Sequence, residues 1–157
     1  MGKVPEAVAA FLAGRRFAVA GVSRDPAQAA NAIYRKLRDA GYEVHPVNPN
    51  TDTAEGAPCC AEVGAVPGRL DGVVIAAHPR AALALVRQCA DAGVPRVWFH
   101  RAFGGGSVSE EAVRECTARG MACIVGGCPL MYCKPVDPFH RCMGWWLGLR
   151  GRITTTG

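Results

Sequence analysis

The sequence predicts an α/β fold: a doubly wound, Rossmann-like parallel sheet of about five strands. Short apolar, β-branched segments recur along the chain, and a segment with helical periodicity follows nearly every one before the next begins. A glycine stands at the end of each helical segment, where a residue in the left-handed conformation commonly stops a helix. Strands that alternate with helices run parallel through right-handed crossovers, so helices should cover both faces of the sheet.

The elements of the first half follow from apolar spacing and from the residues that interrupt it. Val8 and Phe11 recur at helical spacing before Gly14, and Ile33 and Leu37 share one face of the next helix. Short β-branched runs between the helices predict strands, and a stretch rich in glycine and proline predicts a loop. The expected order is helix 4–14, strand 16–21, helix 27–40, strand 43–47, loop 51–70 with one short helical turn, and strand 72–76.

The second half repeats the same alternation. Leu83, Val86 and Cys89 mark a helix that Gly93 ends, and Ser107-Val108-Ser109-Glu110 fits a capping box at the start of another. The expected order is helix 80–92, strand 95–99, a flexible turn at 104–106, a helix from the capping box to about residue 119, and strand 121–125.

We therefore expect one Rossmann-like domain over residues 1–133 and a C-terminal extension over 134–157. The extension is aromatic and basic, and its tip (154–157) is expected to be disordered. Trp145 and Trp146 fit a helix docked on the domain, a homodimer contact or an interfacial membrane helix, of which the docked helix is favoured.

Composition narrows the classes of function. Half of the 157 residues are apolar, which is typical of a globular protein, and the net charge of +5 suits a small anionic ligand. No dense run of Lys and Arg with interleaved aromatics predicts nucleic-acid binding. No apolar segment reaches the roughly 18 residues of a membrane span. Without a signal-peptide pattern, a cytoplasmic location with reduced thiols is expected.

The eight cysteines are interpreted mainly as structural. Four lie inside apolar or helical patterns and are expected to be small buried side chains, namely Cys59, Cys89, Cys116 and Cys123. A second group has the spacing C-x4-C-x6-H-x-C and comprises Cys128, Cys133, His140 and Cys142. Because this spacing matches neither common zinc pattern, no metal site is predicted.

The strand at 16–21 ends on Gly21, immediately before a helical segment. A glycine lets a phosphate approach the backbone, and the start of the following helix offers N–H groups and a positive dipole end. The dinucleotide fingerprint fails here, because Ser23 and Pro26 stand where its second and third glycines belong. Gly21 is consistent both with a plain tight turn and with a turn that binds a pyrophosphate, and the second interpretation is favoured. Ser23 would add a hydroxyl to such a turn, and Arg24 would pair with a phosphate.

The next two strand ends bear on the kind of nucleotide. Asn48 stands where a NAD site usually has Asp or Glu, and a neutral residue there would not repel a ribose 3′-phosphate. Lys36 is a candidate partner for that phosphate. Ala76 and Ala77 are small enough for a flat ring to lie close, while His78 fits a ligand contact and a helix start before proline equally well.

Three motifs carry a resemblance to a known family: Gly21-Val22-Ser23, Val47-Asn48-Pro49-Asn50 and Gly127-Cys128-Pro129. Over about residues 10–133 the chain resembles the CoA-binding-domain family of small bacterial and archaeal proteins, which is similar to the N-terminal domain of the succinyl-CoA synthetase alpha subunit. The resemblance implies that the first turn takes the CoA pyrophosphate and that the adenosine lies near the next two strand ends. The candidate ligand residues are Gly21, Val22, Ser23, Arg24, Lys36, Val47, Asn48, Pro49, Ala76, Ala77, His78, Cys128 and Pro129.

Non-catalytic binding of CoA or an acyl-CoA, in a regulatory or carrier role, is the function predicted first. The synthetase uses a phosphorylated histidine in a second domain that has no counterpart in this sequence, and none of the four histidines has the pattern of a general base with its orienting acid. One alternative is a nicotinamide-nucleotide sensor or oxidoreductase, which rests on fold analogy. Another is a CoA-dependent thiol or acyl-transfer enzyme that uses a cysteine, with Cys128 the first candidate.

Overall fold

The computed structural model describes residues 4–101, 106–133 and 154–156 and confirms the predicted fold class. Its main sheet has the strand order β2-β1-β5-β6-β7-β8, in which the first five strands are parallel and β8 is antiparallel to β7. The strands are β1 (Arg16–Ala20), β2 (Glu43–Val47), β5 (Gly72–Ile75), β6 (Arg96–Phe99), β7 (Ala122–Val125) and β8 (Thr154–Thr156).

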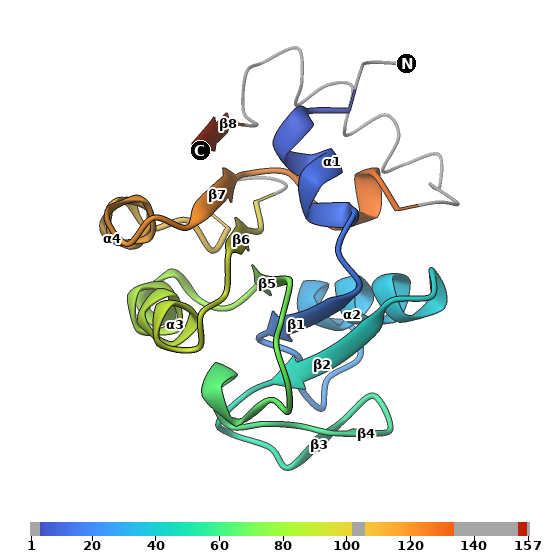
Figure 1. Cartoon of the computed structure of the whole chain (residues 1–157). Helices are drawn as coiled ribbons and strands as arrows, with labels where there is room; N and C mark the ends of the chain where they lie inside the picture. Colours follow the sequence, from blue (N-terminus) through green and yellow to red (C-terminus); the bar gives the residue numbers. More distant parts are fainter. Residues whose placement is uncertain (1–3, 102–105, 134–153, 157) are drawn as a thin grey trace.

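Helices cover both faces of this sheet, as the alternation of elements predicts. Figure 1 shows α1 and α2 on one side and α3 and α4 on the other. Two short 3-10 turns, η1 and η2, complete the described elements. The bounds are α1 (Glu6–Leu12), α2 (Ala29–Asp39), α3 (Pro79–Asp91), α4 (Glu110–Ala118), η1 (Val63–Ala65) and η2 (Pro129–Met131).

Each face of the sheet packs its own apolar core. On one face, Phe11 of α1 stacks on Phe17 with ring centroids 4.8 Å apart and meets Trp98 edge-on at 5.4 Å. The opposite face packs side chains such as Ile75 and Phe99 against α3 and α4. All four residues of β5 are buried because helices lie over both sides, which explains its continuous apolar run.

The strand order creates a topological switch point between β1 and β5. From β1 the chain goes to β2 on one side, and from β5 it continues to β6 and β7 on the other. In open α/β sheets, ligands bind in the crevice outside the carboxyl ends of the strands at such a point. The residues that follow β1 and β5 are therefore the first place to look for a site.

The predicted loop 51–70 contains more structure than expected. The single helical turn is present as η1, but β3 (Thr53–Ala54) and β4 (Ala57–Pro58) also form an antiparallel hairpin. Its turn residues Glu55 and Gly56 both have positive φ, 53° and 75°. A pair of two-residue strands is too short to produce an apolar alternation in the sequence.

Two predictions about chain ends and caps are corrected. Helix α4 starts at Glu110 with Ser109 as its cap, whose Oγ accepts from the Ala112 N–H at 3.4 Å, whereas Ser107 is buried. The prediction that the C-terminal tip (154–157) is disordered is wrong for Thr154–Thr156. These residues form β8, which pairs with β7. The backbone of β7 would otherwise present unpaired polar groups at the sheet edge.

The expectation of reduced thiols is wrong for one pair. Cys116 and Cys123 are both fully buried, as predicted, but they form a disulfide that ties α4 to β7. The end of α4 and the start of β7 bring their Cα atoms to 6.7 Å, within the range a disulfide can bridge. Cys59, Cys60, Cys89 and Cys133 are free thiols.

Several sequence predictions fall on residues outside the described ranges. These are the aromatic segment 134–153, the turn at 102–105, and the pair His140 and Cys142. Within the described ranges, no group of three or more His, Cys, Asp or Glu side chains is placed to hold a metal ion. Nor does any helix found there have the length and apolar character needed to cross a bilayer.

Candidate ligand site at the carboxyl ends of the strands

Gly21 lies where the carboxyl ends of β1, β2 and β5 meet. Its φ is +107°, and a Cβ at this position would stand 2.4 Å from the carbonyl oxygen of Ala76. Its N–H donates to the Val47 carbonyl at 2.9 Å. Glycine is therefore required both by the backbone conformation and by the closeness of β5. The plain tight turn is present, and it lies at the switch point between β1 and β5.

A buried asparagine that sequence reasoning missed holds the turn after Gly21. Asn31 of α2 is 1% exposed; its Oδ1 accepts from the Ser23 N–H at 3.0 Å, and its Nδ2 donates to the Ser23 carbonyl at 2.8 Å. Val22, between Gly21 and this clamp, is fully buried. One signal was available in the sequence, because Asn31 interrupts the apolar face that Ala30 and Ile33 otherwise form on α2.

The hairpin supports this clamp from the other side. Glu55, at the turn between β3 and β4, accepts a second hydrogen bond from Asn31 Nδ2 at 2.7 Å and pairs with Arg35 of α2. The Ser23 peptide is thus fixed through Asn31 by elements on both sides of it. A turn held this way is preorganised, so it would not pay an ordering cost when a ligand binds.

A carboxylate stands at the entry to α2, where a phosphate was predicted. Asp25 accepts from the Gln28 side chain at 2.9 Å and from the Ala27 N–H at 3.0 Å, and these hydrogen bonds lower the pKa of its carboxyl. Ser23 Oγ accepts from the Asp25 N–H at 3.1 Å, and Arg24 is exposed. The Ser23 hydroxyl and N–H are therefore already engaged within the protein.

Asn48 joins the ends of β1 and β2. Its Nδ2 donates to the Val22 carbonyl at 3.0 Å, its Oδ1 accepts from the Asn50 N–H at 2.9 Å, and its own N–H donates to Cys60. The neutral amide predicted for this position therefore has a structural role. Val47 before it is buried, and Pro49 after it is exposed at the edge.

The end of β5 presents the two small residues expected there. Ala76 and Ala77 are half-buried beside the Gly21 turn, and the Ala76 N–H donates to Ala20 at 3.0 Å. His78 is exposed and caps α3, because its Nδ1 accepts from the Arg80 N–H at 3.2 Å and Pro79 begins the helix. The helix-start interpretation of His78 is confirmed, whereas its contact with a ligand stays a prediction.

The remaining three predicted residues lie on α2 and at the start of η2. Lys36 comes seven residues after the start of α2, a helical rise of about 10 Å. Its charge acts on Cys133, a buried thiol whose pKa burial raises to about 11 and Lys36 lowers slightly. Cys128 and Pro129 are buried at the start of η2, against the core that α1 and α2 cover.

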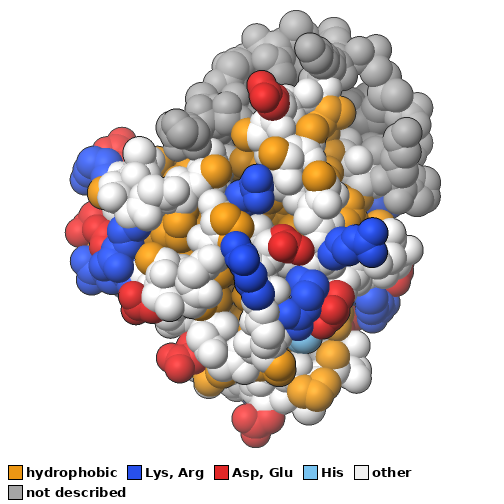
Figure 2. All heavy atoms as spheres, viewed as in Figure 1, with side chains coloured by type: hydrophobic (Ala, Val, Ile, Leu, Met, Phe, Trp, Pro, Cys, Tyr) orange, Lys and Arg blue, Asp and Glu red, His pale blue; other side chains and the backbone are white. Residues whose placement is uncertain are grey.

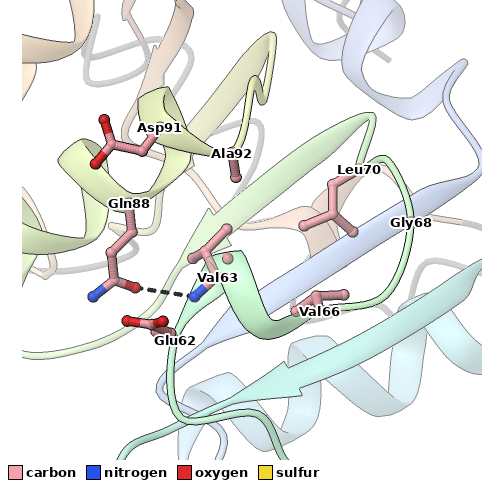
Figure 3. Close-up of a pocket in the computed structure, with 9 residues that line it drawn as sticks. Glu62, Val63, Val66, Gly68, Leu70, Gln88, Asp91 and Ala92 are labelled. Atoms are coloured by element: carbon pink, nitrogen blue, oxygen red, sulfur yellow. Dashed lines mark hydrogen bonds between the residues drawn. The ribbon is translucent and has the colours of Figure 1, made fainter.

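A hollow in the described part of the structure lies elsewhere. Figure 3 shows it between η1, the 66–70 loop and the end of α3, with Val63 and Leu70 among its apolar lining. Its volume is about 320 Å³, and Gln88 Oε1 accepts from the Val63 N–H at 3.0 Å across one side. Because residue 70 precedes β5 and residue 91 ends α3, this hollow faces away from the carboxyl ends of the strands.

Known proteins resemble this chain across most of the described fold. The uncharacterized protein YneT from Bacillus subtilis is 27% identical over 114 residues, which cover 73% of this chain and 82% of YneT. A conserved hypothetical protein from Pyrococcus furiosus is 34% identical, with a TM-score of 0.62, over 68% of this chain and 89% of that one. The structure of Prb, the PH1109 protein redesigned for binding, superposes with a TM-score of 0.73 at 25% identity, over 79% of this chain and 84% of Prb.

One similar structure is an enzyme of known activity. The dinucleotide-forming acetyl-coenzyme A synthetase 1 from Ca. Korarchaeum cryptofilum is 31% identical over 69% of this chain, with a TM-score of 0.59. The match spans only 25% of that synthetase, so it concerns one part of a larger protein. Residues 15–134 also match the family described as CoA binding domain, which includes every strand end described above. This chain belongs to the CoA binding domain family.

Proposed function

We propose that this protein binds CoA without catalysing a reaction, in a regulatory or carrier role, at the carboxyl ends of β1, β2 and β5. Membership of the family supports CoA binding in general. The proposed location of the ligand rests on the Gly21 turn. This turn packs against Ala76 at the β1–β5 switch point and is held by Asn31. The pyrophosphate would lie on this turn, with the adenosine toward Asn48 and Ala77.

The neutral residue after β2 favours CoA over a nicotinamide nucleotide. Asn48 donates one amide hydrogen to Val22 and offers no carboxylate to bind the two ribose hydroxyls of NAD. A CoA ribose carries a 3′-phosphate, which a carboxylate at this position would repel. Arg24, exposed beside the turn, is the predicted partner for that phosphate or for the pyrophosphate.

The thiols of the described residues support a binding role rather than covalent chemistry. Burial raises the pKa of Cys89 to about 12 and that of Cys133 to about 11, so both remain protonated and poorly nucleophilic near neutral pH. Cys128, the candidate nucleophile of the acyl-transfer alternative, is 2% exposed. His78 directs Nδ1 to its own helix as a cap rather than toward a carboxylate.

Thermal unfolding with a panel of nucleotides tests the proposal. CoA at one hundred times its dissociation constant should add about 2.7 kcal/mol to the free energy of unfolding, while NAD(H) and NADP(H) at the same concentration should add much less. A shift with the nicotinamide nucleotides and none with CoA would overturn the proposal. Comparison of CoA with acetyl-CoA and succinyl-CoA would show whether an acyl group is recognised.

The same panel tests the non-catalytic role. CoA and acyl-CoA incubated with the protein should be recovered unchanged, and the protein should gain no acyl group detectable by intact mass. Turnover of acyl-CoA that is lost in Cys128→Ser, with binding retained, would instead establish the acyl-transfer alternative.

A further inference from the structure

Arg101 follows β6 at the same edge of the sheet as the Gly21 turn, and its side chain is half-buried. Its Nε is buried and has no hydrogen-bond partner in the parts of the chain that the structure describes. Nor does any ion pair found there include Arg101, although other arginines pair with Glu or Asp. A buried donor without a partner costs about 1–3 kcal/mol, and more when it is charged. The described residues therefore leave this donor without an acceptor, which a ligand could supply.

The backbone around Arg101 is held firmly. Its N–H donates to the Gly127 carbonyl at 2.9 Å, and the Ser107 N–H donates to the carbonyl of His100 at 2.9 Å. Gly106 approaches so closely that a Cβ there would stand 2.8 Å from Arg101 Cα. The first atoms of the arginine side chain are thus fixed by neighbouring backbone, which lowers the entropy lost when the guanidinium binds an anion.

The position of Arg101 in the sheet places it near the switch point. Adjacent strands are about 4.8 Å apart, so the crevice between β1 and β5 lies one and a half spacings, about 7 Å, from the end of β6. The long arginine side chain can span that distance and presents a planar fork that matches phosphate oxygens. A cation that approaches from β6 would face the Gly21 turn across the crevice.

Other cations around this edge are engaged or displaced. Arg35 pairs with Glu55, and Lys36 is about 10 Å along α2 from its start. Arg24 is exposed and adjacent to the ionised Asp25, whose negative charge opposes a phosphate at the start of α2. Positive charge from the β6 side would offset the charge of Asp25 and add to that of Arg24.

We propose that Arg101 binds the pyrophosphate of the nucleotide at the β1–β5 crevice. This inference rests on the proposed function and adds a residue from a strand end outside the predicted set at β1, β2 and β5. In the complex the guanidinium turns outward and donates to phosphate oxygens, so that Nε exchanges an unpartnered buried position for an acceptor. Charge-assisted hydrogen bonds of this kind are stronger than neutral ones.

Calorimetry with Arg101→Gln tests the proposal with three ligands that share parts of CoA. CoA and ADP contain a pyrophosphate, and pantetheine contains none. The variant should bind CoA and ADP roughly tenfold to a hundredfold more weakly than the wild type, by equal factors, because both lose the same contact. Arg101→Lys should recover only part of the affinity, because a lysine keeps the charge but not the fork.

Arg96→Gln is the matched control, since this substitution removes the same charge at the opposite end of the same strand. It should leave the affinity for CoA within about twofold. A purely structural role for Arg101 would lower the melting temperature of the ligand-free variant, whereas a ligand role should keep it within about 2 °C of wild type.

Each remaining outcome is decisive. Wild-type protein that binds CoA while Arg101→Gln binds it equally well overturns the assignment of Arg101 and leaves the proposed function standing. Loss of affinity for CoA but not for ADP places Arg101 on another part of the ligand and also overturns the assignment. Wild-type protein that binds neither nucleotide overturns both proposals.

Discussion

At position 21 the backbone excludes a side chain for two separable reasons. The positive φ disfavours any L residue, and the Ala76 carbonyl occupies the space of a Cβ. Gly21→Ala should therefore lower the free energy of unfolding by about 3 kcal/mol or more, through conformational strain and backbone overlap together. Chemical denaturation followed by circular dichroism measures the loss.

Gly41 offers a matched control for that substitution. Its φ is +96°, but a Cβ there would meet nothing within 4 Å. Gly41→Ala should thus cost only the conformational term, about 1–2 kcal/mol. Equal losses for the two variants would contradict the packing role assigned to Gly21.

Asp25 carries a charge that works against the proposed ligand. Hydrogen bonds from Gln28 and Ala27 lower the pKa of its carboxyl, so it is ionised at neutral pH beside the predicted pyrophosphate. Asp25→Asn keeps an acceptor oxygen for Ala27 and removes the charge, and it should raise the affinity for CoA about threefold to tenfold at low salt. Calorimetry at two ionic strengths checks this, since the gain should shrink as salt increases. An affinity that falls would mean that Asp25 contacts the ligand favourably.

At the scale of elements, α2 and the β3–β4 hairpin act together on the turn after β1. Asn31 reaches from the buried face of the helix to the Ser23 peptide, and Glu55 of the hairpin completes its hydrogen bonds. The turn that would carry the phosphate is thus stabilised by a segment that sequence analysis classified as loop. Substitutions in the hairpin should therefore change ligand affinity at the proposed site.

Asn31→Ala should destabilise the protein and weaken ligand binding together. It removes three hydrogen bonds and leaves the half-buried N–H and carbonyl of Ser23 without Asn31, at a cost of about 2–4 kcal/mol in the free energy of unfolding. Asn50→Ala is the control, because Asn50 is exposed and contributes only its backbone N–H, so it should change stability by less than about 0.5 kcal/mol. Urea denaturation of both variants decides the point, and a small loss at Asn31 would contradict the clamp.

Helices and strands were predictable because their signals are local. The apolar spacing of Ile33 and Leu37, the glycine after each helix and the four-residue apolar run of β5 all lie within one segment of chain. The hairpin was not predictable because each of its strands has only two residues. The Cys116–Cys123 disulfide and the pairing of Thr154–Thr156 were not predictable because they depend on contact between segments. For the same reason Asn48 could be placed at a strand end but not assigned its hydrogen bond to Val22.

At the scale of the whole molecule, charge is mixed rather than segregated. In Figure 2 the Lys and Arg side chains on the visible face are interspersed with Asp and Glu. The Arg16 guanidinium pairs with Glu43, and the backbone N–H groups of Arg15 and Arg16 donate to the Asp71 carboxylate. Several carboxyl groups therefore have pKa values below their usual range, which ties stability to pH.

Acid should destabilise the protein over a defined range. The Arg15 N–H lowers the pKa of Asp71, and the Arg16 guanidinium lowers that of Glu43. A carboxyl with a lowered folded-state pKa contributes stability that is present above its unfolded value, about 4, and is lost as pH falls through the folded value. The urea midpoint should be nearly constant from pH 7 to about 5 and fall below about 4. Asp71→Asn should lessen that fall, and an unchanged acid profile in this variant would contradict the assignment.

The sequence alone determined the order of the helices and the five parallel strands, the glycine at the end of β1 and the neutral residue at the end of β2, because each depends on side chains close together in the chain. Only the tertiary structure decided which strand ends share the switch point, that Asn31 holds the first turn, and that Arg101, which follows β6, has a buried donor without a described partner. The physical reason is that close approach and hydrogen bonding depend on two residues at once, and the sequence does not show which two residues meet. The two members of each pair here lie between eight and fifty-five residues apart in the chain.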